Sequence, residues 1–295
     1  MKGKYKKITA AILMIFGGVL MCYPWISNWF YDHGVESSVN VYQKKIEKTD
    51  DRQLRGFWED ARMYNQALSR SEAMLTDPFT ETEVPSEDVS YYEILNTDGS
   101  GRMCFVDIPK IAVYLPVFHG TSAEVLRKGA GHLEGSSLPV GGRGTHAVVS
   151  AHTGINSSKL FSDLTEMEEG DLFFIHVLDK TMAYRVTKIS VIRPEETSML
   201  KVEKDKDLVS LVTCTPYGVN THRLVVTGER TAYSEQVRQE AQKEKKPEKS
   251  KWMQAYKKAV LTGMAAASGA AAVTECAGRI KNRKERKRGH EKNMV

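Results

Sequence analysis

The sequence predicts an all-β domain decorated with short helices over residues 91–233. In this range short runs rich in β-branched and aromatic residues alternate with segments of Gly, Pro, Asn and Asp. Several short strands separated by turn signals are typical of a closed barrel or a sandwich. The expected strands are 103–108, 114–118, 147–150, 172–177, 182–192, 208–213 and 223–227.

Two short helices are expected to interrupt these strands. The run Thr121-Ser-Ala-Glu124 matches the capping-box pattern, so the first helix should open there. The second is expected over 157–167, where apolar residues share one face. Upstream, apolar residues at three- and four-residue steps predict an amphipathic helical region within 31–73, which either docks on the β domain or forms a stalk.

The N-terminus has the pattern of a membrane anchor. Four lysines within residues 1–7 precede an apolar run, 8–30, that is long enough to cross a bilayer as a helix. Aromatic residues close the run, where a cleaved signal peptide would instead carry a small-residue cleavage site. We therefore expect an uncleaved signal-anchor, with residues 1–7 in the cytoplasm and the β domain outside the cell.

The C-terminal segment resembles a weaker anchor. Residues 234–258 form a charged linker, 259–277 are small and apolar, and 278–295 are rich in basic residues. Alanine and glycine contribute little free energy of transfer into lipid, and two lysines flank the entry to the segment. The basic tail favours a second transmembrane helix at 259–277 with a cytoplasmic tail, and we keep it as a candidate.

Charge and cysteine content exclude several classes of function. The net charge of +5 is concentrated near the two ends, which indicates membrane flanks rather than a face that binds nucleic acid. The four cysteines are far apart and form no CxxC pair, so the spacing of zinc ligands is absent. We expect no metal and no cofactor. The sequence leaves open a disulfide between Cys104 and Cys214, although a protein with a reactive thiol outside the cell would keep the two apart.

Candidate catalytic residues lie at the ends of expected strands. Cys214 follows a strand and precedes a Pro-Tyr-Gly turn, and Arg223 begins the next strand. A thiolate is a nucleophile and commonly has a histidine partner. His152 comes at the end of the expected strand 147–150, and Cys214 comes at the end of the expected strand 208–213. If these two strands are neighbours, both side chains would lie at one rim. His222 adjoins Arg223 and should point to the opposite face.

The three residue types together predict acyl transfer. Attack by a Cys214 thiolate on an amide carbonyl creates an oxyanion, and the permanently charged guanidinium of Arg223 can donate hydrogen bonds to it. His152 would protonate the departing amine and later deprotonate the incoming one.

These residues resemble the sortases of Gram-positive bacteria. The segment Leu211-Val-Thr-Cys214, with Arg223 downstream, is similar to the TLxTC signature and distal arginine of that family, and the run 213–224 resembles its class C, pilin-polymerising branch. Similar blocks occur at 108–111, 119–121, 129–135 and 137–142. The resemblance implies an eight-stranded sortase β-barrel in which Cys214, His152 and Arg223 are the catalytic residues.

The resemblance also gives a role to a proline turn. Asp77-Pro78-Phe79 ends the upstream helical region, because proline disfavours helix in the preceding residue. Class C sortases carry a lid with an Asp-Pro-aromatic motif, so residues 74–90 are expected to form a lid loop. In such a lid Asp77 would face Arg223, and Phe79 would cover Cys214.

The chain departs from the family beside the histidine. It has Ser150-Ala-His-Thr-Gly154 where the family often has Ser-Gly-His-Arg-Gly, which leaves the preference of the substrate groove open. The resemblance implies a membrane-anchored cysteine transpeptidase with its catalytic domain on the cell-wall side. It would cleave an LPxTG-like sorting signal, hold a thioacyl-enzyme and transfer the acyl group to a pilin lysine.

Three other functions remain open. They are a housekeeping-type sortase that attaches surface proteins to cell-wall peptide, a non-catalytic surface scaffold on the same barrel, and a simple cysteine protease. The expected partners are pilin subunits, other LPxTG-bearing surface proteins and the lipid bilayer, with no nucleic acid.

Overall fold

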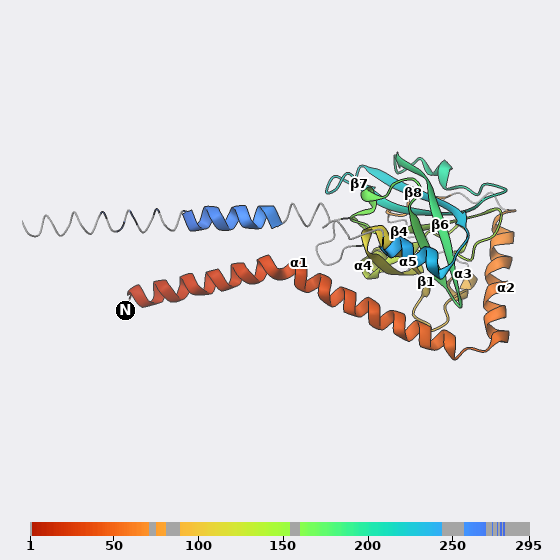
Figure 1. The fold of residues 1–295 in the computed structure, drawn as a ribbon, viewed down its shortest axis with the longest axis horizontal. Helices are drawn as coiled ribbons and strands as arrows, with labels where there is room; N and C mark the ends of the chain where they lie inside the picture. Colours follow the sequence, from red (N-terminus) through yellow and green to blue (C-terminus); the bar gives the residue numbers. More distant parts are fainter. Residues whose placement is uncertain are drawn as a thin grey trace, which may run out of the picture. The chain divides into compact units, whose positions relative to one another are not determined.

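The computed structural model describes residues 2–70, 75–80, 89–153, 160–243 and 257–269, with the isolated positions 273, 276, 278 and 280. The chain divides into two units, Met1–Glu248 and Lys249–Val295. The first contains a β-barrel and the helices that precede it (Figure 1). In the second, residues 257–269 are helical.

Eight strands close the barrel, as predicted. Their order around it is β1-β2-β3-β4-β7-β8-β6-β5. The pairs β2–β3 and β4–β7 are parallel and the others are antiparallel. The strands are β1 (Arg102–Ile108), β2 (Val113–His119), β3 (Ala130–His132), β4 (Thr145–Ser150), β5 (Leu172–Val177), β6 (Lys180–Ile192), β7 (Asp207–Thr215) and β8 (His222–Thr231).

All seven expected strands are present, and β3 is the one that the sequence did not predict. It has three residues, and Gly131 at its centre gives no β-branched signal. A Cβ on Gly131 would come within 2.3 Å of the Gly120 carbonyl oxygen. The glycine is therefore needed for the close approach of the two backbone segments at the β2–β3 pair.

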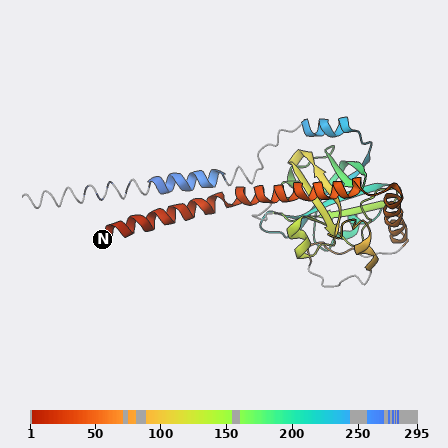
Figure 2. The ribbon, with the colours of Figure 1, turned by 90° about the horizontal axis from the view of Figure 1, so that it is seen from below.

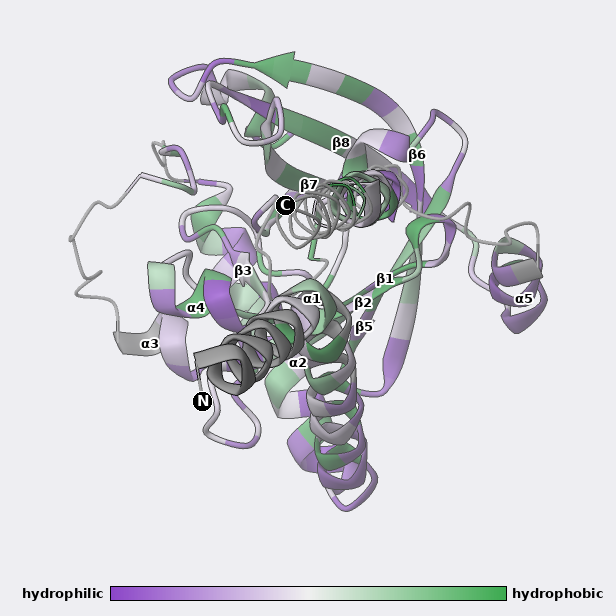
Figure 3. Ribbon diagram, turned by 90° about the vertical axis from the view of Figure 1, so that its left-hand side faces the viewer, coloured by the Kyte–Doolittle hydropathy of each residue, from purple (hydrophilic) through white to green (hydrophobic). Residues whose placement is uncertain are grey.

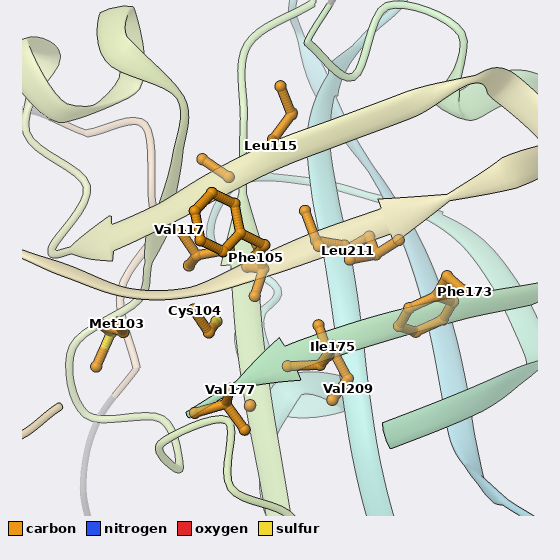
Figure 4. Packing of buried hydrophobic residues seen from close by; sticks show 14 of the residues in the cluster. Met103, Cys104, Phe105, Leu115, Val117, Phe173, Ile175, Val177, Val209 and Leu211 are labelled. Atoms are coloured by element: carbon orange, nitrogen blue, oxygen red, sulfur yellow. The ribbon is translucent and has the colours of Figure 1, made fainter. Parts of the chain in front are cut away.

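The barrel interior holds the main hydrophobic core. Cys104, Ile175 and Leu211 contribute to this cluster from three different strands (Figure 4). Every residue of β1 is buried, so this strand is covered on its outer face as well. The cover comes from α1 (Lys2–Glu47), whose Tyr42 stacks edge-on against Phe105 with 5.3 Å between ring centroids.

The helices α1 and α2 (Asp51–Leu68) dock on the barrel (Figure 2). Along α2, apolar and polar residues are mixed, as on an amphipathic helix whose apolar residues recur at three- and four-residue steps (Figure 3). Trp58 of α2 donates its indole N–H to Asp179 Oδ1 at 2.8 Å. Asn65 exchanges two hydrogen bonds with the backbone of Leu138, at 2.7 and 3.1 Å. The docked interpretation of this region is therefore correct, and the stalk interpretation is not.

The remaining helices are short. They are α3 (Val89–Glu93), α4 (Ala123–Lys128), α5 (Glu235–Lys243) and the 3-10 turns η1 (Pro109–Ile111), η2 (Leu164–Glu166) and η3 (Thr197–Leu200).

Two details of the expected helices were wrong. The N-cap of α4 is Ser122 and not Thr121, because the Ser122 hydroxyl accepts the Val125 N–H at 3.3 Å. Over 160–167 the structure has turns and η2 instead of the expected helix, and residues 157–159 lie outside the described part. Leu160 has a φ of 39° and is fully buried. Burial of this segment in the core, and not its helical periodicity, therefore determines its conformation.

The predicted membrane segments are described in part: side chains are described at 257–269 and at most positions from 17 to 30. Within the described residues, no helix combines the length and apolar character needed to cross a membrane. The backbone of α1 is helical through 8–30, but the side chains of 2–16 lie outside the description. Residues 244–256 of the linker, 81–88 of the expected lid loop and 281–295 of the tail lie wholly outside the described part of the chain.

Candidate active site

The antiparallel pairing of β7 and β8 brings Cys214 and Arg223 together. They are direct cross-strand partners in the ladder, so their side chains leave the sheet on the same face. Each is 8% exposed. The Thr215–Pro216 peptide bond is cis, and the chain then turns into β8. The thiol and the guanidinium thus lie side by side at one rim of the barrel.

His152 reaches the same rim because β4 runs parallel to β7. The two strands pair from Thr145 and Asp207 onward, and Ser150 lies opposite Val212. The pairing continues past the end of β4, where the Ala151 N–H donates to Val212 O at 3.1 Å. Parallel strands end at the same edge, so His152 and Cys214 lie at neighbouring strand ends.

Three other histidines of the barrel have structural roles. The His132 ring lies between Tyr91 Oη, at 2.9 Å, and the Ser137 carbonyl, at 2.8 Å. His146 is held between the Lys201 carbonyl and the Ser210 hydroxyl. His119 bonds two backbone carbonyls, at 2.8 Å each. Each ring has both nitrogens engaged, whereas neither ring nitrogen of His152 has a hydrogen-bond partner among the described residues.

The Asp-Pro-Phe segment covers the site from outside the barrel. Arg223 donates from Nε to Asp77 Oδ1 and from a terminal nitrogen to Asp77 Oδ2, both at 2.7 Å. The Phe79 ring lies 5.7 Å from the His152 ring between centroids, and the Arg223 guanidinium carbon lies 5.1 Å from the Phe79 centroid. The phenyl ring therefore lies against the histidine and the arginine, while the carboxylate occupies one edge of the guanidinium.

A second hydrophobic cluster holds the lid segment in place. Leu75 packs with five buried residues on the outer side of the sheet, Leu133, Val148, Leu200, Val212 and Val225. The Thr197 hydroxyl donates to the Leu75 carbonyl at 2.9 Å. Sequence reasoning missed Thr197, and no local signal marks it, because it lies 122 positions from its partner.

The electrostatics of the covered site favour neutral forms of both reacting groups. Burial raises the pKa of the Cys214 thiol, the Arg223 cation opposes that rise, and the Asp77 carboxylate adds to it. Burial lowers the pKa of His152. With the lid in place, thiol and imidazole therefore favour their uncharged forms, and the thiolate is disfavoured.

Arg223 remains a cation in this environment. Burial opposes its charge, but the hydrogen bonds to Asp77 and the charges of Cys214 and Asp77 together outweigh burial, and the pKa of Arg223 is raised. Its other terminal nitrogen donates to the carbonyls of Asn220 and His222 at 3.0 and 3.1 Å. The two backbone bonds fix the guanidinium beside Cys214. The edge bound to Asp77 becomes available when the lid leaves.

No metal site accompanies these residues in the described part of the chain. There, no three His, Cys, Asp or Glu residues are grouped so that they could hold an ion. The chemistry that the arrangement can perform is nucleophilic attack by sulfur, proton transfer by imidazole and stabilisation of an oxyanion by guanidinium.

Comparison with known proteins identifies the family. The sortase domain family matches residues 106–231. The crystal structure of sortase C-1 from Streptococcus pneumoniae is 40% identical, with a TM-score of 0.61, over 67% of this chain and 100% of that one. The chain belongs to the sortase family, in its class C branch.

Other relatives agree with this assignment. Sortase C-1 from Actinomyces oris is 42% identical, with a TM-score of 0.57, over 61% of this chain and 99% of that one. Among curated proteins, sortase A of Bacillus anthracis is 24% identical over 77% of this chain and 95% of its own length. The chain described here, as a member of the sortase family, is therefore a cysteine transpeptidase.

Proposed function

We propose that this class C sortase is a membrane-anchored pilus-assembly enzyme that joins a sorting signal to a lysine of a pilin subunit. The observation that carries the proposal is the covered site, in which Asp77 binds both edge nitrogens of Arg223 and Phe79 lies against His152. A similar structure from group B Streptococcus, 39% identical, is described as a pilus-related sortase C. Another, from Streptococcus pneumoniae and 37% identical, is described as giving insight into pilin substrate specificity.

The first half-reaction cleaves the sorting signal. The Cys214 thiolate attacks the carbonyl carbon of threonine in an LPxTG-like sequence, and a sulfur–carbon bond forms. Arg223 donates hydrogen bonds to the resulting oxyanion. His152, as imidazolium, gives its proton to the glycine nitrogen when the carbon–nitrogen bond breaks. The products are a thioester on Cys214 and a free glycine amine.

The second half-reaction resolves the thioester. A lysine amine attacks the thioester carbonyl, and His152 removes a proton from that nitrogen. Arg223 again stabilises the oxyanion, the carbon–sulfur bond breaks, and Cys214 leaves as a thiolate. An isopeptide bond joins the two proteins.

The lid must leave before either step. In the covered state Asp77 occupies the donors of Arg223 that the oxyanion requires, and its charge disfavours the thiolate. Displacing the segment therefore both exposes Cys214 and lowers the pKa of its thiol. On this proposal lid opening is a chemical activation as well as a removal of steric block.

Anchoring in the cell membrane is part of the proposal. Four lysines precede the apolar run 8–30, and α1 is helical throughout it. This arrangement would hold the barrel outside the cell, where exported proteins with sorting signals pass.

Attachment of surface proteins to cell-wall peptide is the alternative. The curated relatives include several sortases A, at 21% to 31% identity, which favours this function. The scaffold alternative is disfavoured because Cys214, Arg223 and His152 meet at one rim in an arrangement suited to acyl transfer.

A competition between acceptors tests the proposal. The enzyme is given an LPxTG peptide together with a lysine-bearing pilin domain and a peptide with the free amine of a cell-wall stem. Mass spectrometry should find the isopeptide on the pilin lysine, and a lysine-to-arginine pilin should abolish it. Transfer to the cell-wall peptide alone would establish the housekeeping-type function, and release of free acid alone would establish a protease.

A further inference from the structure

Among the described residues, the ring of His152 has no orienting partner of the kind that a catalytic base commonly has. Within the described part of the chain, no hydrogen bond reaches either ring nitrogen of His152. Its ring contact is with Phe79, which belongs to the segment that must leave. In most nucleophile–base pairs a third group orients the base. Among the described residues, the contacts that can hold this histidine once that segment has left are made by its backbone and the backbone of its neighbours.

Two threonine hydroxyls form a short chain beside that backbone. Thr213 Oγ1 lies 2.7 Å from Ala151 O, and Thr153 Oγ1 lies 2.6 Å from Thr213 Oγ1. A carbonyl oxygen can only accept, so the Thr213 hydroxyl donates its single proton to Ala151. The proton between the two hydroxyls must then come from Thr153.

These two hydrogen bonds link the residue before Cys214 to both sequence neighbours of His152. Thr213 immediately precedes Cys214, while Ala151 and Thr153 flank His152. Thr213 is 1% exposed and Ala151 is fully buried, so water has little access to replace a lost hydroxyl there. The Ala151 N–H to Val212 O bond and the Phe161 N–H to His152 O bond, at 3.1 and 3.2 Å, hold the same turn from other sides.

We propose that Thr213 and Thr153 are positioning residues that hold His152 at working distance from Cys214. The inference rests on the proposed catalytic roles of those two residues. It also assigns a function to Thr153, at a position where the resembled pattern has arginine. The hydroxyl supplies a link that remains when the lid has opened.

The variants Thr153→Val and Thr213→Val remove the hydroxyls at nearly constant volume. Misplacement of a catalytic group by about 1 Å costs on the order of 100-fold in rate. We expect kcat for LPxTG peptide cleavage to fall about 10-fold in Thr153→Val and about 100-fold in Thr213→Val, with KM changed less than about two-fold. Thr153→Ser keeps the donor and should retain kcat within about two-fold of the original.

Thr145→Val is the matched control. The Thr145 hydroxyl donates to Gly142 O at 2.7 Å, at the opposite end of β4, and Thr145 is also buried. Its loss should lower Tm as the Thr153 change does, but leave kcat unaltered. A second readout is the pH profile of Cys214 alkylation by a small thiol reagent. In Thr153→Val the midpoint should move to higher pH, because in the open site a displaced imidazolium stabilises the thiolate less.

The results separate the inference from the proposed function. If Thr153→Val is folded and keeps both kcat and the alkylation midpoint, or if Thr153→Ser loses as much as Thr153→Val, the positioning role is wrong. Should Thr213→Val fail to fold, Thr153→Val and Thr153→Ser decide alone. If instead Cys214→Ala still forms product, the proposed function itself fails, whatever the threonine variants show.

Discussion

Two cysteines in strands of the same barrel show how a thiol buried among apolar residues differs from a thiol with charged neighbours. Cys104 in β1 is fully buried, and Cys214 in β7 is nearly so, and both are free thiols. Burial raises the pKa of both thiols. For Cys104 burial accounts for the shift, whereas Arg223 and Asp77 also act on Cys214. Cys214 has in addition a cation directly across the ladder and a carboxylate that belongs to a separate segment. Burial alone therefore disfavours the thiolate. The charges around Cys214 can in addition raise or lower the pKa of its thiol.

The location within the strand explains why only one thiol has charged neighbours. Cys104 lies within β1, opposite Val117, in a strand that is buried along its whole length. At the position of Cys104, within the hydrophobic cluster, a charge would lose its hydration without compensation. Cys214 lies one residue before the end of β7, where loops and the lid can bring polar groups to it. The barrel rim is thus the place where a buried thiol can have ionic partners.

Replacing each cysteine by alanine is the most direct test of the comparison. Cys214→Ala should abolish the covalent acyl-enzyme with an LPxTG peptide and lower turnover by at least about 10⁴-fold, because no other nucleophile is positioned there. Cys104→Ala should keep turnover and cost about 1 kcal/mol of stability through the small cavity it leaves. Intact-protein mass spectrometry and thermal unfolding measure the two effects. An acyl adduct on Cys214→Ala would remove this residue from the mechanism.

Substituting the cation sharpens the comparison further. Arg223→Lys keeps the charge but loses the planar set of donors, so kcat should fall about 100-fold or more. Arg230→Lys is the control on the same strand, since Arg230 is partly exposed and lies 3.8 Å from its carboxylate partner Asp207. Steady-state kinetics should show turnover within about two-fold of the original for that control. Near-normal turnover in Arg223→Lys would exclude the oxyanion role.

Opening the lid should have the smallest of the three effects, an acceleration. Asp77→Ala removes a charge that raises the pKa of Cys214, so the thiol should ionise at lower pH and its alkylation at pH 7 should speed up about 10-fold. Phe79→Ala should also speed alkylation, but by exposing the thiol, and should shift the pH midpoint less.

Asp98→Ala is the control for that experiment, because it breaks a different carboxylate–arginine pair, with Arg102, away from the site. Alkylation followed by mass shift across pH 5 to 10, roughly the range between the ordinary pKa values of carboxylates and tyrosine, gives the profiles. Equal rates in Asp77→Ala and the original enzyme would mean that the segment does not restrain the thiol.

Local patterns predicted most of the barrel and the centre of the site. Seven strands followed from alternation and turn residues, and the turn after Cys214 predicted its approach to Arg223. The prediction failed at β3, where Gly131 serves a close backbone approach, and at 157–167, where core burial competes with helical periodicity. In both places a distant contact decides the local conformation, and a local pattern cannot contain it.

The lid and the threonine chain illustrate the same limit within the site. Asp77 and Arg223 are 146 positions apart, and nothing near either residue indicates the other. Their contact was anticipated through the resemblance to class C sortases and not through the residues themselves. Thr153 and Thr213, 60 positions apart, drew attention only as parts of motifs.

The amino-acid sequence alone therefore specified the strand pattern, the approach of Cys214 to Arg223 across a turn, and the basic and apolar order of the N-terminus. These features depend on side-chain periodicity and turn chemistry, which act over a few residues. The parallel pairing of β4 with β7, the bidentate contact of Asp77 with Arg223 and the hydroxyl chain beside His152 arise only in the folded molecule. They depend on closure of the barrel and on the need of buried polar groups for partners, which are properties of the whole chain.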